Sequence, residues 1–354
     1  MKINQYFLKI INLKLFFLKP KQNNILVYDR ASKWFSDILF KGKKVCYYDT
    51  RHESINLYVF FKTILSTFFF NFYQNYKFNF FSYVNPKIIY TSVDTNIGFY
   101  KLKKIYPKAI YISDQNGMRS KKFYKDLKKE KKAGTALISD ILFCFGNNDK
   151  KKISHYIKSK IYQLGNTVNN NFIYKSNKSN IYKVVYIPTG GILKKIDIKI
   201  FSYLIKFCEE KKLKLLFLDK QRFKRKKIIQ SFFDGKFSYL SHKKKRYSYS
   251  SFNKNTIAVF THSTLGYDLL AKGIKAFSFD SHHDYHERKK SNSGFYWENL
   301  TNYNNFKSAI NKVINYENKK WKKKCLKLSY ELNYYDKNNL KKKRIINNCL
   351  KSIY

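Results

Sequence analysis

Acidic residues are scarce in this sequence. Its 354 residues include 23 Asp and Glu against 72 Lys and Arg, which gives a formal net charge of +49 at pH 7. Such an excess is typical of proteins that bind nucleic acid or an anionic membrane surface. Most of it is Lys, however, spread along the whole chain among many Asn, Ile, Phe and Tyr, as a biased genome would produce on any surface. Because nucleic-acid recognition favours clustered Arg, we expect that the excess of Lys reflects a compositional bias of the surface rather than a dedicated nucleic-acid patch.

Paired cysteines are absent. Cys46, Cys144, Cys208, Cys325 and Cys349 are far apart, and no two of them form a CxxC pair. The sequence therefore predicts neither a zinc knuckle nor a disulfide framework. Three of the five lie in apolar runs, where Cys usually serves as a small buried hydrophobic residue. This usage fits a reducing cytoplasm.

The sequence also lacks an apolar run long enough to cross a membrane. The longest, at 57–72, contains Lys62 and is shorter than the roughly 20 residues that a spanning helix needs. We expect one long buried or interfacial helix there. The first residues are basic and apolar, but Lys9 and Lys14 interrupt them and no small-residue cleavage site follows, so they make a poor signal peptide. Peripheral contact with the anionic inner face of the cytoplasmic membrane is an alternative to a purely cytoplasmic location.

Short β-rich apolar runs alternate with longer helical patterns from residue 25 onward. The first half has such runs at 25–29, 44–49, 87–94, 109–114, 140–145 and 161–165, and the second half has them at 183–188, 213–219, 237–241, 256–260 and 275–279. This alternation predicts βαβ units and parallel sheets. Right-handed crossovers then place the carboxyl ends of all strands in a sheet at one edge, where open α/β sheets bind ligands.

We therefore predict an α/β fold with two Rossmann-like domains facing a cleft, which is a usual position for a ligand. The predicted first domain covers 1–168 and a polar linker covers 169–180. The second domain covers 181–320, and 321–354 form a basic helical tail. Within the second domain, one buried helical face is predicted from the spacing of Phe306, Ala309, Ile310, Val313 and Ile314.

Two loops of the second domain have the composition of phosphate-binding turns. They contain Ser263, Thr264 and Gly266 after the strand at 256–260, and Thr189, Gly190 and Gly191 after the strand at 183–188. A Ser or Thr cap, free backbone N–H groups and the helix dipole favour an anion at a helix start. Two glycines let a backbone approach a ligand closely. Neither loop is a Walker A or GxGxxG motif, and helix capping without a ligand is the alternative.

Polar clusters follow three strands of the first domain. Their candidate site residues are Arg51, Glu53, Asp94, Asp114, Gln115, Asn116 and Arg119. A carboxylate such as Asp94 or Asp114 can deprotonate an acceptor hydroxyl, and the amides and cations can hold an acceptor. Ordinary capping explains each carboxylate equally well, and Arg51 can simply pair with Glu53.

A polar segment at 279–290 follows the last predicted strand and contains His282 and His283 among several carboxylates. Histidine and carboxylate are common metal ligands. An exposed loop at the rim of the cleft is the simpler explanation. We therefore predict no metal site and retain His282 and His283 as ligand contacts.

Five stretches, taken in order, resemble a known family. They are 47–56, 85–107, 111–120, 142–157 and 261–280. Over residues 23–320 the set resembles bacterial surface-carbohydrate biosynthesis proteins with a glycosyltransferase B-type (GT-B) fold. More distantly it is similar to capsule-polymer and teichoic-acid-type transferases and to sugar-nucleotide 2-epimerases. The resemblance implies transfer of a sugar from a nucleotide-activated donor, held by the second domain, to a glycan or lipid-linked glycan acceptor held by the first.

The resemblance also implies roles for single residues. The donor-side signature is matched by Ser263, Thr264, Gly266, Tyr267 and Asp268, with phosphate at the turn and the ribose near Asp268. On the acceptor side Gln115 and Asn116 match, but wider relatives often have His in place of Asn116, which leaves the catalytic base open. No cofactor or metal is expected, because basic side chains and a helix N-terminus can stabilise the leaving diphosphate. A 2-epimerase-like isomerase and a basic nucleic-acid-binding protein are the alternatives.

Overall fold

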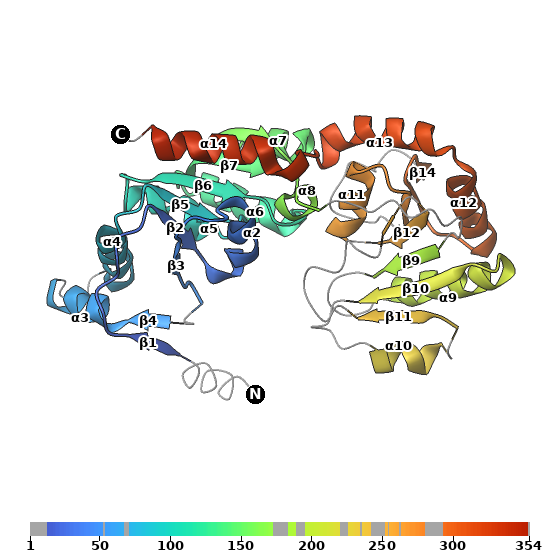
Figure 1. Ribbon diagram of the computed structural model, residues 1–354, viewed down its shortest axis with the longest axis horizontal. Coiled ribbons are helices and arrows are strands. Elements are labelled where there is room, and N and C mark those ends of the chain that lie inside the picture. Colours follow the sequence, from blue (N-terminus) through green and yellow to red (C-terminus); the bar gives the residue numbers. More distant parts are fainter. Residues whose placement is uncertain are drawn as a thin grey trace. The chain divides into compact units, whose positions relative to one another are not determined.

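The chain divides into two compact units in the computed structural model (Figure 1). Unit 1 contains Met1–Asn116, Lys122–Asn171 and Asp336–Tyr354, and unit 2 contains Gly117–Lys121 and Phe172–Tyr335. The residues that the structure describes are 13–51, 54–66, 71–172, 183–188, 195–219, 226–233, 236–241, 252–253, 255–261, 263–279 and 293–352.

Unit 1 is built on a six-stranded parallel sheet with the order β3-β2-β5-β6-β7-β8. Its strands are β2 (Ile25–Tyr28), β3 (Cys46–Tyr48), β5 (Ile88–Thr91), β6 (Ile110–Asp114), β7 (Ile138–Cys144) and β8 (Lys158–Gln163). β2 and β5 are buried along their whole length, as expected for strands covered on both faces. All six strands were predicted from the sequence and are confirmed. The strand order reverses between β2 and β5.

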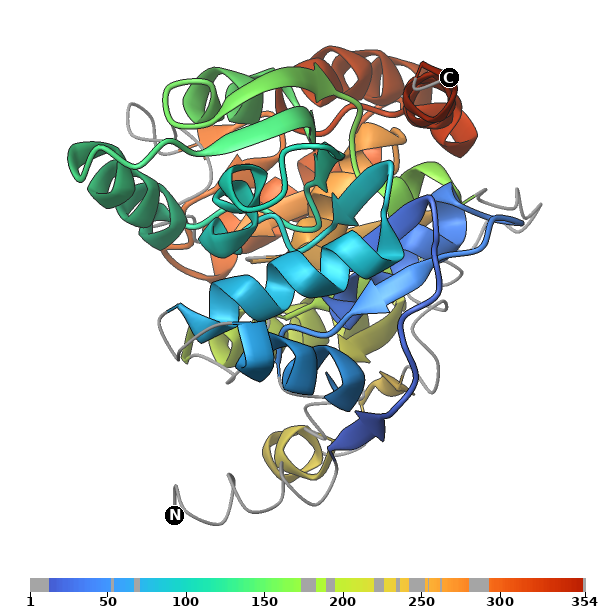
Figure 2. The same ribbon diagram turned by 90° about the vertical axis from the view of Figure 1, so that its left-hand side faces the viewer.

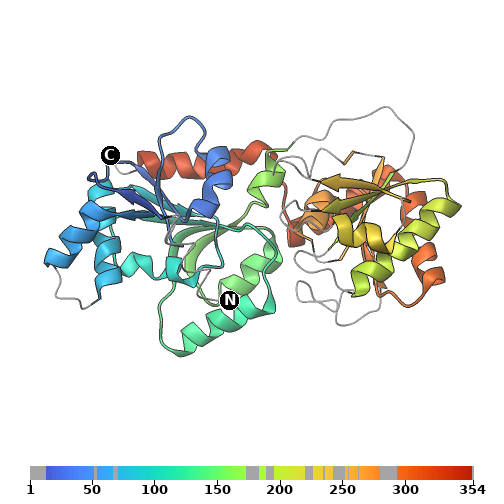
Figure 3. The same ribbon diagram turned by 90° about the horizontal axis from the view of Figure 1, so that it is seen from below.

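Helices cover this sheet on either side (Figure 3). The helices of unit 1 are α2 (Lys33–Leu39), α3 (Leu57–Ser66), α4 (Phe72–Val84), α5 (Ile97–Tyr100), α6 (Lys121–Lys132), α7 (Asn147–Ile153), α8 (Thr167–Asn170) and α14 (Leu340–Lys351), with short 3-10 turns at Arg30–Ser32, Leu102–Lys104 and Lys337–Asn339. The core between them is rich in tyrosine: Tyr28 stacks on Tyr48 with 5.5 Å between ring centroids. The Tyr111 hydroxyl donates to the Tyr106 carbonyl at 2.7 Å, so its burial leaves no unpaired polar group.

The apolar run at 57–72 does not form the single long helix predicted from the sequence. It contains all of α3 and the first residue of α4, and the two helices pack against each other (Figure 2). Asn71 begins α4 with left-handed backbone angles, φ 58° and ψ 29°, which a continuous helix does not allow. A second feature was not predicted: β1 (Lys14–Phe16) pairs in parallel with β4 (Ser54–Asn56) next to α3.

Unit 2 is built on a seven-stranded sheet with the order β11-β10-β9-β12-β13-β15-β14, parallel except for the last pair. The strands are β9 (Lys183–Ile187), β10 (Lys214–Asp219), β11 (Ser238–Ser241), β12 (Thr256–Phe260), β13 (Ala276–Phe279), β14 (Ser293–Gly294) and β15 (Trp297–Glu298). The helices are α9 (Lys195–Glu210), α10 (Lys226–Phe232), α11 (Thr264–Ala271), α12 (Tyr303–Asn315) and α13 (Asn318–Leu332). The order reverses between β9 and β12, as in a Rossmann fold. The predicted buried face of α12 is confirmed for four residues, and Ile314 is partly buried.

Two predicted boundaries differ from the structure. The predicted linker starts at residue 169, but Asn169 and Asn170 are buried in α8 of unit 1, where the Asn170 amide donates to the Leu164 carbonyl at 2.7 Å. The predicted tail at 321–354 is not one segment. α13 buries Trp321 and Cys325 in the core of unit 2, whereas α14 belongs to unit 1. Apolar side chains spaced along α13 explain this difference, because they need a core to cover them.

Candidate active site

The carboxyl edge of the unit 2 sheet is tied together where the strand order reverses. β9 and β12 are neighbours there, with Ile187 opposite Phe260. The buried carboxylate of Asp197, in the first turn of α9, accepts hydrogen bonds from the Tyr186 hydroxyl at 2.7 Å and from Thr261 Oγ1 at 3.2 Å. Both strand ends are thereby fixed at the position where open α/β sheets bind ligands.

Helix α11 begins directly at this edge. Ser263 is its N-cap residue, with extended backbone angles, and within the described part of the chain its side chain makes no capping hydrogen bond. The Ser263 carbonyl accepts the Gly266 N–H at 3.1 Å, which forms the first turn. Ser263 and Thr264 are partly exposed. The helix start therefore presents a hydroxyl and the positive end of the helix dipole to a ligand.

The segment that follows β6 in the sequence joins this helix start. Residues Gly117–Lys121 belong to unit 2, and the Met118 N–H donates to Thr264 Oγ1 at 3.2 Å. Met118 packs on the unit 2 core, and Arg119 beside it is 2% exposed. Arg119, predicted as an acceptor-side residue, is therefore placed in the same unit as the predicted donor loop.

Three other predicted donor residues have packing roles. A Cβ atom on Gly266 would lie well under 3.0 Å from the Phe260 ring, so only glycine lets α11 lie this close to β12. The Tyr267 ring contacts the Phe260 ring edge-on, with 5.3 Å between centroids. Asp268 is 1% exposed, and its Oδ1 accepts the Asn333 amide at 2.7 Å. This partner ties α11 to the end of α13 and does not favour the predicted contact of Asp268 with a ribose.

In unit 1 the predicted base Asp114 lies in a saturated buried network. Its Oδ1 accepts Lys342 Nζ at 2.7 Å, and its Oδ2 accepts the hydroxyls of Thr167 and Tyr90. The Lys342 and Asp114 side chains are both 0% exposed. Burial, and then the charge of Asp114, raise the pKa of Tyr90 well above its ordinary value, so Tyr90 stays a donor. These contacts favour a structural role for Asp114.

Gln115 is itself fully buried and also has structural partners. Its Oε1 accepts the Phe145 N–H at 2.8 Å and its Nε2 donates to Asp149 at 2.9 Å. Asp94, after β5, is fully buried and accepts the Asn116 N–H at 3.2 Å, while the Asn116 side chain is exposed. Asp94 and Asn116 are therefore brought together at the carboxyl edge of β5 and β6.

Two crossed ion pairs join the loops after β2 and β3. Arg30 contacts Asp49 through two nitrogens at 2.8 and 3.1 Å, and Arg51 Nε donates to Asp29 at 3.2 Å. Arg51 thus pairs with Asp29. Asp29 has a φ of 77°, a conformation that non-glycine residues seldom adopt and that often marks a functional loop. The Arg30 and Arg51 side chains are 43% and 57% exposed, so each guanidinium also faces solvent.

The hydroxyls of Ser32 and Thr91 meet at the reversal of strand order in unit 1, 3.4 Å apart. The Ser92 N–H donates to Ser32 Oγ at 2.8 Å, which joins the ends of β2 and β5. Within the described residues the Ser92 hydroxyl itself is buried without a hydrogen-bond partner. The carboxyl edge of this sheet is therefore polar from β3 to β6.

Six predicted site residues lie outside the described residues: Glu53, Thr189, Gly190, Gly191, His282 and His283. Among the residues that are described, no group of three or more His, Cys, Asp or Glu side chains is arranged to hold a metal ion. None of the helices in the described segments has both the length and the apolar character of a transmembrane span.

The two units, each with reversed strand order and a polar carboxyl edge, define a GT-B-type α/β protein. A family model described as "putative O-antigen biosynthesis protein" matches residues 193–350. This match agrees with the surface-carbohydrate resemblance found in the sequence. No curated protein matches the sequence.

Solved structures with this fold are similar over most of the chain. The wall teichoic acid polymerase TagF is 10% identical, with 94% of this chain and 90% of that chain covered and a TM-score of 0.54. MnaA from S. aureus, solved with UDP, is 14% identical, with 97% of each chain covered and a TM-score of 0.56. UDP-GlcNAc 2-epimerase from Neisseria meningitidis, bound to UDP-GlcNAc, is 13% identical, with 93% and 99% covered and a TM-score of 0.54. These likenesses confirm the predicted fold class.

Sequence reasoning missed the residues that act across long separations. Lys342 and Thr167 complete the Asp114 network from positions far along the chain, and no local pattern marks them. Arg30, in contrast, could have been identified as a site residue from the sequence. Only eight of the 72 cationic residues are Arg, and two of these, Arg30 and Arg51, closely follow neighbouring predicted strands. In a chain whose surface charge is mostly Lys, such an Arg indicates a position that requires the planar guanidinium group and its paired N–H donors.

Proposed function

We propose that this protein is a glycosyltransferase of bacterial surface polysaccharide assembly, which transfers a sugar from a nucleotide-activated donor to a glycan or lipid-linked glycan. The observation that carries the proposal is the start of α11 at the strand reversal of unit 2, where nucleotide phosphates commonly bind in open α/β sheets. The O-antigen match includes α11. Two of the similar structures hold UDP or UDP-GlcNAc, which supports a nucleotide-sugar donor.

The donor diphosphate is proposed to bind at the start of α11. Ser263, Thr264 and the first backbone N–H groups of the helix contact it in this proposal. Gly190 and Gly191, which lie outside the described residues, are kept as donor contacts on the basis of the sequence alone. Negative charge grows on the diphosphate as the sugar departs, and the positive end of the α11 dipole stabilises it. The proposed reaction therefore uses no cofactor and no metal ion.

The acceptor is proposed to bind at the carboxyl edge of the unit 1 sheet. Asp94 and Asp114 are both 0% exposed, and Asp114 is bound to Lys342 and two hydroxyls, so neither carboxylate is assigned as the base that deprotonates the acceptor. The exposed faces of Arg30 and Arg51 suit a phosphate or carboxylate of the acceptor. A lipid-linked acceptor would place the enzyme at the cytoplasmic face of the membrane.

Ser263→Ala tests the donor site cleanly. Because Ser263 makes no capping hydrogen bond among the described residues, the variant should keep the melting temperature of the free protein. We expect its affinity for nucleoside diphosphates, measured by isothermal titration with UDP and CDP and their sugar conjugates, to fall about tenfold, as for a lost hydrogen bond to a charged group.

Asn302→Ala is the matched control. Asn302 caps α12 by accepting the Asn305 N–H at 2.9 Å. Its removal should lower stability by about 1 kcal/mol and leave nucleotide affinity unchanged. The donor site is refuted if no nucleotide or nucleotide sugar binds the wild-type protein, or if both variants bind equally well.

A 2-epimerase-like activity is the second candidate, favoured by the equal TM-scores of TagF and the Neisseria meningitidis epimerase. Incubation with UDP-GlcNAc alone, followed by NMR of the sugar, separates the two. An epimerised sugar formed without any acceptor identifies an isomerase. Sugar transfer that depends on an added acceptor identifies a transferase.

A further inference from the structure

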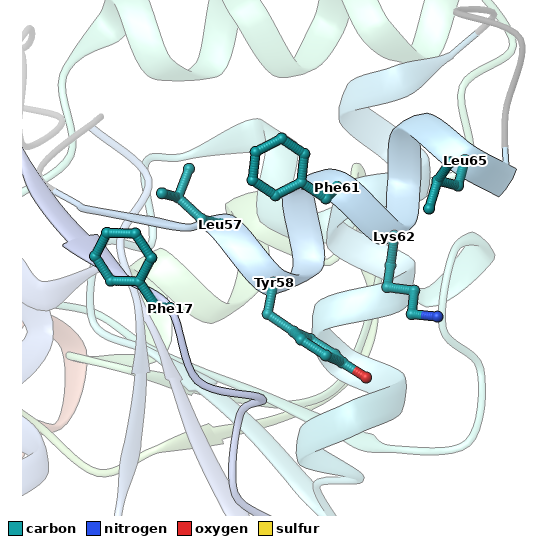
Figure 4. Close-up of a pocket in the computed structure, with 6 residues that line it drawn as sticks. All are labelled: Phe17, Leu57, Tyr58, Phe61, Lys62 and Leu65. Carbon is teal, nitrogen blue, oxygen red and sulfur yellow. The ribbon is translucent and has the colours of Figure 1, made fainter.

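Unit 1 exposes a cluster of large apolar side chains beside α3. We name it the apolar face and define it as Phe17, Leu18, Leu57, Phe61 and Leu65. Four of them are strongly exposed: Phe17 by 68%, Leu18 by 80%, Phe61 by 57% and Leu65 by 81%. With Tyr58 and Lys62, all but Leu18 line a pocket of about 240 Å³ (Figure 4). Apolar side chains that gather in this way usually mark an interaction site.

The pattern of α3 is opposite to that of an ordinary surface helix. Val59 and Thr63 are its buried residues, yet Leu57, Phe61 and Leu65 form a second stripe at i, i+4 spacing that faces outward. An amphipathic helix on the surface of a water-soluble protein carries polar side chains on its outward face. Tyr58 and Lys62 form the neighbouring stripe, and Figure 4 shows both extending away from Phe61. A hydroxyl and an ammonium thus border the apolar stripe.

The described segments that carry the apolar face, together with helix α4 packed on α3, have charge of one sign. The segments 13–28, 54–66 and 71–84 contain no Asp or Glu, whereas Lys14, Lys19, Lys21 and Lys62 are all exposed. Lys19 Nζ lies 5.2 Å from the centroid of the Tyr83 ring. Lysines with long apolar stems can bury the stem and keep the charge in the headgroup layer of a membrane.

Ordered backbone holds these side chains in place. β1 pairs with β4, with Leu15 opposite Ile55. Asn56, at the end of β4, donates through Nδ2 to the Leu18 carbonyl at 2.9 Å and accepts the Val59 N–H at 3.0 Å. The same asparagine therefore fixes both the segment after β1 and the start of α3. The apolar face is consequently presented as one preorganised surface.

We infer that the apolar face inserts into the headgroup and upper acyl region of an anionic lipid bilayer. Exposed aliphatic and aromatic side chains give the apolar contact, and the lysines give attraction to anionic lipid, which is the combination of an interfacial membrane anchor. A second copy of the chain is a poorer occupant, since pairing this face with itself brings lysines of like charge together. Nucleic acid is a poorer occupant as well, since the two most exposed side chains of the face, Leu18 and Leu65, are aliphatic and cannot stack on bases. The inference does not depend on which sugar reaction unit 2 supports.

Vesicle co-sedimentation of the full chain tests this inference. The wild-type protein should bind vesicles of phosphatidylcholine mixed with phosphatidylglycerol. Phe61→Ser with Leu65→Ser should lower the partition coefficient about 30-fold, as expected when two apolar side chains are about half buried in lipid. Lys14→Gln and Lys62→Gln should each lower it about fivefold on the mixed vesicles and leave pure phosphatidylcholine unaffected.

The matched control is on α13, where Leu326 and Tyr330 also lie at i, i+4 spacing and are 53% and 49% exposed. Leu326→Ser with Tyr330→Ser should bind vesicles like the wild type. Because all four positions are exposed, circular dichroism should show folded protein for both double variants. The inference is overturned if the α3 variant binds as tightly as the α13 variant, since general positive charge then explains binding. It is also overturned if the α3 variant alone changes the oligomeric mass in light scattering, since a second copy is then the occupant.

Discussion

Lys342→Met should strongly destabilise unit 1. Lys342 Nζ donates to Asp114 Oδ1, the Gly165 carbonyl and Thr167 Oγ1 at 2.7 to 2.8 Å, which uses all three of its protons. Both members of the ion pair are 0% exposed. Met fills a similar volume but leaves the Asp114 carboxylate buried without a counter-charge. Breaking one side of such a pair costs about 3–5 kcal/mol, compared with about 1 kcal/mol for an exposed pair.

Urea unfolding followed by circular dichroism, together with hydrogen exchange of residues 340–351, measures this effect. Exchange of the α14 amides should speed up most, because Lys342 anchors this helix to the sheet edge. Lys341→Met is the control: its side chain is exposed, and the change should stay within about 0.5 kcal/mol. Adding Asp114→Asn to Lys342→Met should recover much of the lost stability, since the buried charge is then removed. A loss below about 1 kcal/mol for Lys342→Met, or no recovery in the double variant, would refute the reasoning.

Two further predictions concern α11. Gly266→Ala should lower the free energy of unfolding of unit 2 by about 1–3 kcal/mol, because the new methyl group overlaps the Phe260 ring; in a Phe260→Leu background the loss should shrink, and an equal loss in both backgrounds would contradict the proposed clash. Burial lowers the pKa of Lys272 from 10.5 to about 8, against a smaller opposite effect of Asp268. As the pH rises, the folded state therefore releases this proton before the unfolded state does. In urea titrations the free energy of unfolding of the wild type should rise between about pH 8 and pH 10 relative to that of Lys272→Met. If the wild type and Lys272→Met give parallel pH profiles, the lowered pKa is disproved.

The fold was predictable because its signal is local. Buried parallel strands are short continuous apolar runs, and helices repeat their apolar positions every three or four residues, so 25–29 and 256–260 could be assigned without any tertiary information. The error at 57–72 has the same origin. An apolar run is equally compatible with one long helix and with two packed helices, and the left-handed Asn71 that separates them carries little sequence signal.

The candidate site was predictable only in its position along the chain. Strand ends in an α/β sheet must meet at one edge, so the sequence alone places Ser263, Asp94 and Asp114 at the carboxyl edges of their sheets. Only the tertiary structure decides which of these polar groups already has partners. Lys342 lies 228 residues from Asp114, and Asn333 lies 65 residues from Asp268. Burial is a property of the packed chain, so whether a side chain is exposed depends on contacts across such separations. The assignment of α14 to unit 1 and the outward position of the apolar stripe on α3 depend on the same long-range contacts.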